Sequence, residues 1–73
     1  MMKPETVQKL IKRMERSLER HYCGKYAELS MDYITDKIAW LHHYKHITKE
    51  QFDRLVNMVL AVYEGWDEFP GNN

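Results

Sequence analysis

The side chains best suited to chemistry in this sequence are five bases near its N-terminus, and the chemistry they offer is the binding of anions. If residues 4–23 form a helix, these bases lie on the side opposite Val7, Met14 and Leu18. Several are like-charged neighbours four residues apart, an arrangement that is mildly destabilising, whereas a purely solubilising face more often mixes the two signs. The five bases, called the basic stripe below, are Lys9, Lys12, Arg13, Arg16 and Arg20. The stripe predicts a contact surface for an acidic protein or for nucleic acid, and a solvated face is the alternative.

The basic stripe belongs to a wider division of charge along the chain. Residues 1–25 contain seven bases and three acids, and residues 26–73 contain four bases and eight acids. The formal net charge of zero therefore combines a basic first part, at +4, with an acidic remainder, at −4. Such a division can mark a surface that meets a partner.

A second candidate surface is aromatic and lies on the segment 26–44. Tyrosine and tryptophan are favoured where one side of the ring is buried and the other meets water, which is also the composition of interfaces. We expect these side chains to contact a partner protein or a second copy of the chain in a homodimer. The alternative is that this helix is central and touches both of its neighbours. The set, called the aromatic face, is Tyr26, Tyr33, Trp40 and Tyr44.

The same segment carries acids at four-residue spacing, Glu28, Asp32 and Asp36, which we call the acidic ladder. On a helix they would share a third side, away from both the apolar stripe and the aromatic face. The ladder could meet the basic stripe of a second copy, and a solvated face is again the alternative.

Histidine and cysteine raise the question of a metal site. His42 and His46 are four residues apart, a spacing that can hold zinc, and His21 precedes Cys23 by two residues. However, no Cys-x-x-Cys pair or fourth ligand accompanies them, and the dipole at a helix C-terminus also favours histidine. We therefore expect no metal and no other cofactor.

Signals for catalysis are weaker still. The sequence has no glycine-rich phosphate loop, no nucleophile elbow and no His-Glu-x-x-His motif. Asp32 and Asp36 would be paired carboxylates on one helix, but nothing in the sequence indicates a cleft around them, so we interpret them as surface charge. We expect no enzymatic activity and assign no catalytic residue.

Three amphipathic helices must position these surfaces. Pro4 suits a first helical turn, and Gly24 is a typical left-handed terminator, so the first helix is predicted over 4–23. The second is predicted over 26–44, because the apolar period already holds there before Ser30, which could otherwise cap the helix.

The third helix is predicted over 48–64 from agreeing start and stop signals. Thr48 and Gln51 form a capping box, and Gly65 ends the helix. One face is lined by Phe52, Leu55, Val56, Val59, Val62 and Tyr63, and Leu60 widens it. The start of this helix resembles that of the short C-terminal domains of bacterial proteins, over fewer than a dozen residues, Ile47-Thr48-Lys49-Glu50-Gln51-Phe52 and Leu55. The capping box accounts for most of these residues, and no family is assigned.

The fold class expected is all-α, a small three-helix bundle with antiparallel neighbours in a single domain over residues 1–73. In the tail, 65–73, Trp66 is expected to fold back onto the last helical turn. The first residues lack an apolar run after their positive charge, and no stretch is long enough to span a membrane, so we expect neither a signal peptide nor a membrane helix. A lone cysteine, Cys23, fits a reducing compartment, which favours the cytoplasm.

Small size, many aromatic residues and segregated charge together predict a non-enzymatic protein–protein interaction module. We expect a regulator, adaptor or inhibitor of the kind that bacteria and phages encode, acting by binding a macromolecule. The alternative is a nucleic-acid-binding protein. In that case the contact would use the basic stripe, because acids outnumber bases in segment 48–64.

Overall fold

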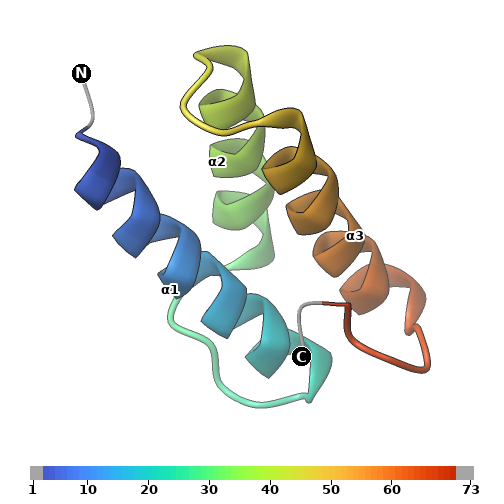
Figure 1. Ribbon diagram of the computed structural model, residues 1–73. Helices are drawn as coiled ribbons and strands as arrows, with labels where there is room; N and C mark the ends of the chain where they lie inside the picture. The colour runs from blue at the N-terminus through green and yellow to red at the C-terminus, as the bar shows by residue number, and fades with distance from the viewer. Residues whose placement is uncertain (1–2, 71–73) are drawn as a thin grey trace.

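The computed structural model describes residues 3–70 and contains three helices, α1 (Pro4–Tyr22), α2 (Met31–His43) and α3 (Lys49–Glu64) (Figure 1). Each helix runs antiparallel to the next along the chain, and no strand is present among the described residues. The all-α three-helix bundle predicted from the sequence is therefore confirmed. Among the described residues, no helix combines the length and apolar character needed to cross a membrane.

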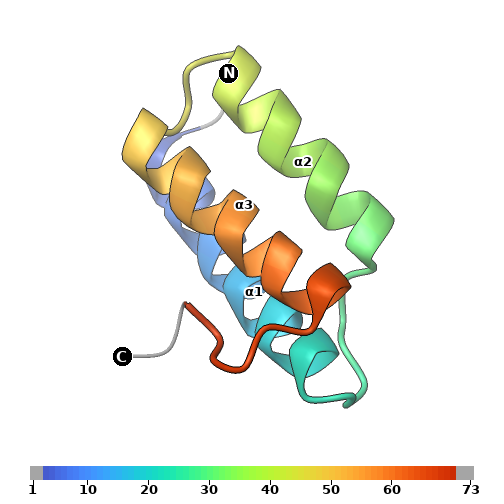
Figure 2. The same cartoon turned by 90° about the vertical axis from the view of Figure 1, so that its right-hand side faces the viewer.

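α3 is the central helix of the bundle. It packs against both α1 and α2, whereas α1 and α2 contact each other least. Figure 2 shows α2 beside α3, with α1 behind α3. All three helices and the turn before α3 supply the core, which consists of Val7, Leu10, Ile11, Met14, Leu18, Ile34, Ile38, Leu41, Ile47, Leu55, Met58 and Val59. α2 does touch both of its neighbours, but the central helix is α3 and not the 26–44 helix.

The central position of α3 also widens its buried side. Met58 and Ala61, which were not part of the predicted apolar face, are 1% and 0% exposed. Leu60 and Tyr63, which were part of it, are 36% and 59% exposed. The buried side of α3 faces two helices at once, so it extends to Met58 and Ala61 and leaves Leu60 and Tyr63 outside.

The ends of α1 and α3 follow the predicted signals. Gly24 has a φ of 72°, and the N–H of Lys25 donates to the carbonyl of Arg20 at 2.8 Å, which closes α1. At the start of α3 the Thr48–Gln51 capping box is complete, with both hydrogen bonds formed.

The start of α2 differs from the prediction: the helix begins at Met31 and not near Tyr26. Ser30 caps it, since its hydroxyl accepts a hydrogen bond from the N–H of Tyr33 at 3.1 Å. Residues 23–30 instead form a loop that runs along the end of α1 (Figure 1). The loop is held in place by polar contacts with α1, so its backbone needs no helical hydrogen bonds.

The tail folds back on the bundle over its described part, residues 65–70. The N–H of Trp66 donates to the carbonyl of Ala61 at 3.1 Å, which completes the cap at Gly65. The hydroxyl of Tyr22 donates to the carbonyl of Trp66, and the rings of Tyr22 and Phe69 lie 5.2 Å apart. Trp66 lies against the last turn of α3, as expected, because its Nε1–H donates to Oε1 of Glu64 at 2.8 Å. Phe69, which was not part of the prediction, packs against the core. Residues 71–73 of the predicted tail lie outside the described residues.

Candidate functional site

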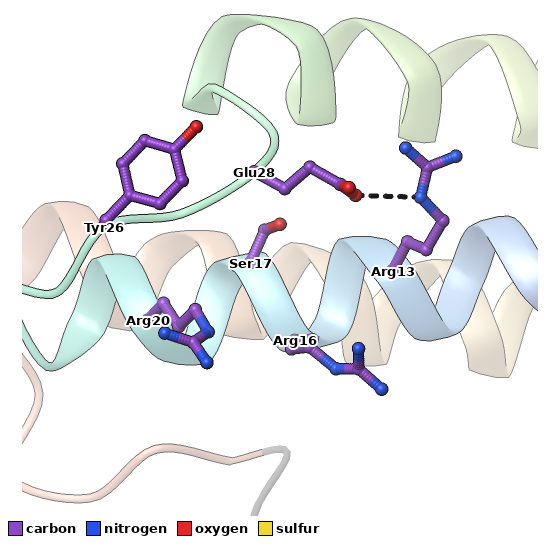
Figure 3. A pocket seen from close by; sticks show the side chains of 6 residues that line it. All are labelled: Arg13, Arg16, Ser17, Arg20, Tyr26 and Glu28. Carbon is purple, nitrogen blue, oxygen red and sulfur yellow. Dashed lines mark hydrogen bonds and ion pairs between the residues drawn. The ribbon is translucent and has the colours of Figure 1, made fainter.

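Three members of the basic stripe line an open hollow of about 320 Å³ between the C-terminal half of α1 and the 23–30 loop (Figure 3). We call it the arginine hollow. Its lining combines a cationic wall from α1 with one carboxylate and one aromatic ring from the loop. The residues are Arg13, Arg16, Ser17, Arg20, Tyr26 and Glu28. Three guanidinium groups against one carboxylate leave the lining with a net charge of +2, which suits an anionic ligand.

The loop side of the arginine hollow is fixed by contacts to α1. Ser17 is 2% exposed, and its hydroxyl accepts a hydrogen bond from the N–H of Leu29 at 3.2 Å. The Nε2–H of His21 donates to the carbonyl of Leu29 at 2.7 Å. Glu28 Oε1 lies 2.9 Å from Nε of Arg13, and the two groups point toward each other in Figure 3. The N–H and the carbonyl of Leu29 are thus both hydrogen-bonded to side chains of α1, and the ion pair of Glu28 adds a third contact.

All five members of the basic stripe are exposed on α1. Within the described part of the chain, the side chains of Lys9, Lys12, Arg16 and Arg20 make no ion pair or hydrogen bond. Arg16 and Arg20 also border a second hollow of about 280 Å³. They form a ridge between two depressions, while Lys9 and Lys12 lie further toward the start of α1 and do not line the arginine hollow.

One acid that flanks the basic stripe is held away from it. Glu15 pairs with Arg54 of α3, and its side chain is only 23% exposed. This ion pair draws a negative charge toward α3. The outward side of α1 is therefore more positive than the sequence alone indicated.

Glu28 and Ser17 were not predicted as parts of a site. Glu28 was assigned to the acidic ladder, but it lies in the loop and pairs with Arg13 of its own chain, so the ladder is reduced to Asp32 and Asp36 on α2. For Ser17 the available signal was a hydroxyl on the apolar side of an amphipathic helix, where a polar group needs a partner.

The aromatic face is divided because α2 begins at Met31, after Tyr26. Tyr26 lies in the loop, lines the arginine hollow and is 85% exposed. Tyr33 and Trp40 lie on α2 and Tyr44 caps its C-terminus, with exposed fractions of 41%, 38% and 58%. Large aromatic side chains are thus left at the surface of a helix that packs mainly against α3.

The histidines have aromatic or backbone partners. The ring of His42 stacks on Phe52 with 3.9 Å between centroids, and the ring of His46 stacks on Trp40 at 5.2 Å. Among the described residues, no group of three or more His, Cys, Asp or Glu side chains is placed to hold a metal ion.

Comparison with known proteins gave no match. No family model fits this sequence, and neither a curated protein nor a solved structure shows significant similarity to it. Function is therefore inferred from the surfaces of the molecule.

Proposed function

We propose that this chain is a non-enzymatic interaction module that binds an acidic, extended segment of a partner protein at the arginine hollow. The observation that supports the proposal most is the placement of Glu28. A carboxylate from the 23–30 loop of this chain already lies on Arg13, while Arg16 and Arg20 of the same lining have no partner among the described residues. The ion pair of Arg13 with Glu28 is thus an example of the contact that Arg16 and Arg20 can make with carboxylates of a ligand.

The contact made by Glu28 can be exchanged at little cost. The side chains of Arg13 and Glu28 are 54% and 63% exposed, and ion pairs at such exposure contribute about 0–1 kcal/mol. A ligand carboxylate can therefore replace Glu28 on Arg13 without unfolding the loop, which retains the two hydrogen bonds at Leu29.

The spacing of the free arginines suits an extended peptide. Arg16 and Arg20 are one helical turn apart, a rise of roughly 6 Å. Alternate residues of an extended strand are about 6.6 Å apart. Acidic side chains at alternate positions of one strand therefore reach both guanidinium groups, and arginine binds carboxylates with charge-assisted hydrogen bonds.

In this proposal the module acts only by binding its partner, as a small adaptor, regulator or inhibitor. It covers an acidic segment and changes what else that segment can contact. The exposed, free Cys23 is consistent with a reducing compartment such as the cytoplasm.

A second candidate function, nucleic-acid binding, is favoured by the same basic stripe. Four of its side chains lack an ion pair among the described residues, and Tyr26, at 85% exposed, offers a ring for base stacking. Carboxylates of this chain repel either anionic ligand. A short acidic segment at the two free arginines meets only Glu28 in the lining, whereas a long phosphate backbone would also approach Asp32 and Asp36 on α2. We therefore rank this function second.

The experiment compares two labelled probes of equal net charge: a peptide of alternating Glu and Gly, and a mixed-sequence single-stranded DNA. We expect the peptide to bind more tightly, and the double variant Arg16→Ala/Arg20→Ala to weaken it at least about tenfold, because hydrogen bonds to charged groups contribute about 1.5–3 kcal/mol each. The matched control is Lys49→Ala, whose side chain is 84% exposed on α3, and it should bind like the parent.

Tighter binding of the DNA with a steep loss on adding salt would favour the second function. If neither probe binds, the arginine hollow is not a binding site. The same conclusion follows if the double variant binds the peptide as tightly as the Lys49→Ala control does.

A further inference from the structure

We infer that the outward face of α2 pairs with the same face of a second copy of this chain, with the two α2 helices antiparallel. This inference does not depend on the arginine hollow, since it uses other residues and another side of the molecule. It is supported by the grouping of exposed aromatic side chains on α2 and by the order of charges along that helix.

The side chains on this face form a continuous row, here called the α2 row, of Tyr33, Lys37, Trp40 and Tyr44, in which the three aromatic residues are exposed and Lys37 is half-buried. Their spacing of four, three and four residues is that of the contact seam of two paired helices. The rings of Trp40 and Tyr44 lie 5.0 Å apart, and Nζ of Lys37 lies 5.5 Å and 5.1 Å from the ring centroids of Tyr33 and Trp40. The α2 row is thus already ordered in the single chain.

Acidic residues lie beside the first half of the α2 row, and basic residues lie at its end. Asp32 and Asp36 lie in the first half of α2, and His43 ends it, followed by Lys45; all four are exposed. A parallel partner would place the acidic ends of both helices at the same end of the pair. An antiparallel partner places His43 of one copy between Asp32 and Asp36 of the other, and it also opposes the two helix dipoles favourably.

The aromatic residues fit the same arrangement. With the two-fold axis between Ile38 and Ala39, Lys37 of one copy lies opposite Trp40 of the other, and Tyr33 opposite Tyr44. Lys37 then contacts aromatic rings of both copies, and such cation–π contacts strengthen when water is excluded. Each group on this face finds its complement on the same face, which identifies a second copy as the occupant.

The size of this face predicts a weak dimer. α2 has 13 residues, so the contact is roughly 20 Å long and one helix wide. Interfaces of this extent lie at the low end of protein–protein contacts, below about 1,200 Å² in total. We therefore expect dissociation in the micromolar range, with a monomer that stays folded because the core lies elsewhere.

The first test is sedimentation equilibrium of the full chain over a wide concentration range. We expect reversible dimerisation that Trp40→Ala weakens about 30-fold or more, as tryptophan at interface centres does. Tyr44→Ala, whose side chain is 58% exposed, serves as a second variant if Trp40→Ala is not folded by circular dichroism. The control is Tyr63→Ala on α3, at 59% exposed, which should leave dimerisation unchanged. A chain that stays monomeric, or variants that dimerise like the parent, would overturn the inference.

A charge exchange tests the antiparallel direction. Asp36→Lys and His43→Glu should each weaken the dimer, and the double variant should restore it, because the two positions meet only between copies. Within one copy they are seven residues apart on α2, a rise of about 10 Å that excludes direct contact. A double variant that dimerises no better than the weaker single variant would contradict the antiparallel pairing.

Discussion

At the residue scale, chemically identical side chains on α1 have different roles because of what the loop places beside them. Arg13 holds Glu28 and so attaches the loop, whereas Arg16 and Arg20 project from the same helix without a partner among the described residues. The sequence predicts which side of α1 these arginines occupy, since helical spacing alone determines it. It does not predict the pairing with Glu28, which depends on where the chain turns after Gly24.

The free arginines should matter for binding and not for stability. We expect Arg16→Ala and Arg20→Ala each to change the free energy of unfolding by no more than about 0.5 kcal/mol, because surface substitutions away from specific contacts usually stay within that limit. Urea denaturation followed by circular dichroism measures this. A larger loss would show that these side chains support the fold.

Removal of the internal carboxylate should strengthen the site. Glu28→Gln frees Arg13 and removes a negative charge from the arginine hollow, so we expect tighter binding of the Glu–Gly peptide. The accompanying loss of stability should stay below about 1 kcal/mol, as for other exposed ion pairs. Titration with the peptide measures the effect, and Glu50→Gln at the start of α3 is the charge-matched control. Weaker binding by Glu28→Gln than by Glu50→Gln would mean that Glu28 supports the ligand and does not compete with it.

At the scale of the elements, the helix ends show what the sequence could predict. Local signals agree at α3, where the Thr48–Gln51 capping box and Gly65 each mark a boundary, and both predicted ends are correct. At the start of α2 two local signals conflict: an apolar period that begins at Ala27 and a cap at Ser30. The cap determines the boundary because Leu29 is held by Ser17 and His21 of α1. Such tertiary contacts leave no periodic trace in the sequence, so neither the loop nor the arginine hollow that it closes could be predicted.

The cap at Ser30 should therefore carry a measurable share of stability. Ser30→Ala leaves the N–H of Tyr33 without its partner, and loss of such a cap typically costs about 1 kcal/mol. Thr35→Ala is a suitable comparison, because the Thr35 hydroxyl only bonds the carbonyl of Asp32 within α2. Thermal and urea denaturation of both variants measure the difference. Equal stability of Ser30→Ala and the parent would place the start of α2 elsewhere.

At the scale of the whole molecule, α3 connects a basic helix to an acidic one. α1 carries the basic stripe, α2 carries Asp32 and Asp36, and each packs mainly against α3. The division of charge along the sequence thus becomes a division between two outer helices. Both proposed contact surfaces, the arginine hollow and the α2 row, lie on these outer helices, so their geometry depends on how firmly α3 holds them.

The core of α3 should accordingly dominate the stability of the molecule. Leu55 is 1% exposed in the centre of the bundle, so Leu55→Ala leaves a cavity and should cost about 2–5 kcal/mol, the usual range for such a change. Leu60→Ala makes the same chemical change on the same helix at 36% exposed, and it should cost much less, since little packing is lost. Parallel urea denaturation of the two variants measures both effects. Because a bundle of this size has little stability to lose, we expect Leu55→Ala to unfold at markedly lower urea and to lose peptide binding and dimerisation with its helicity. Equal midpoints for the two variants would place the core on another side of α3.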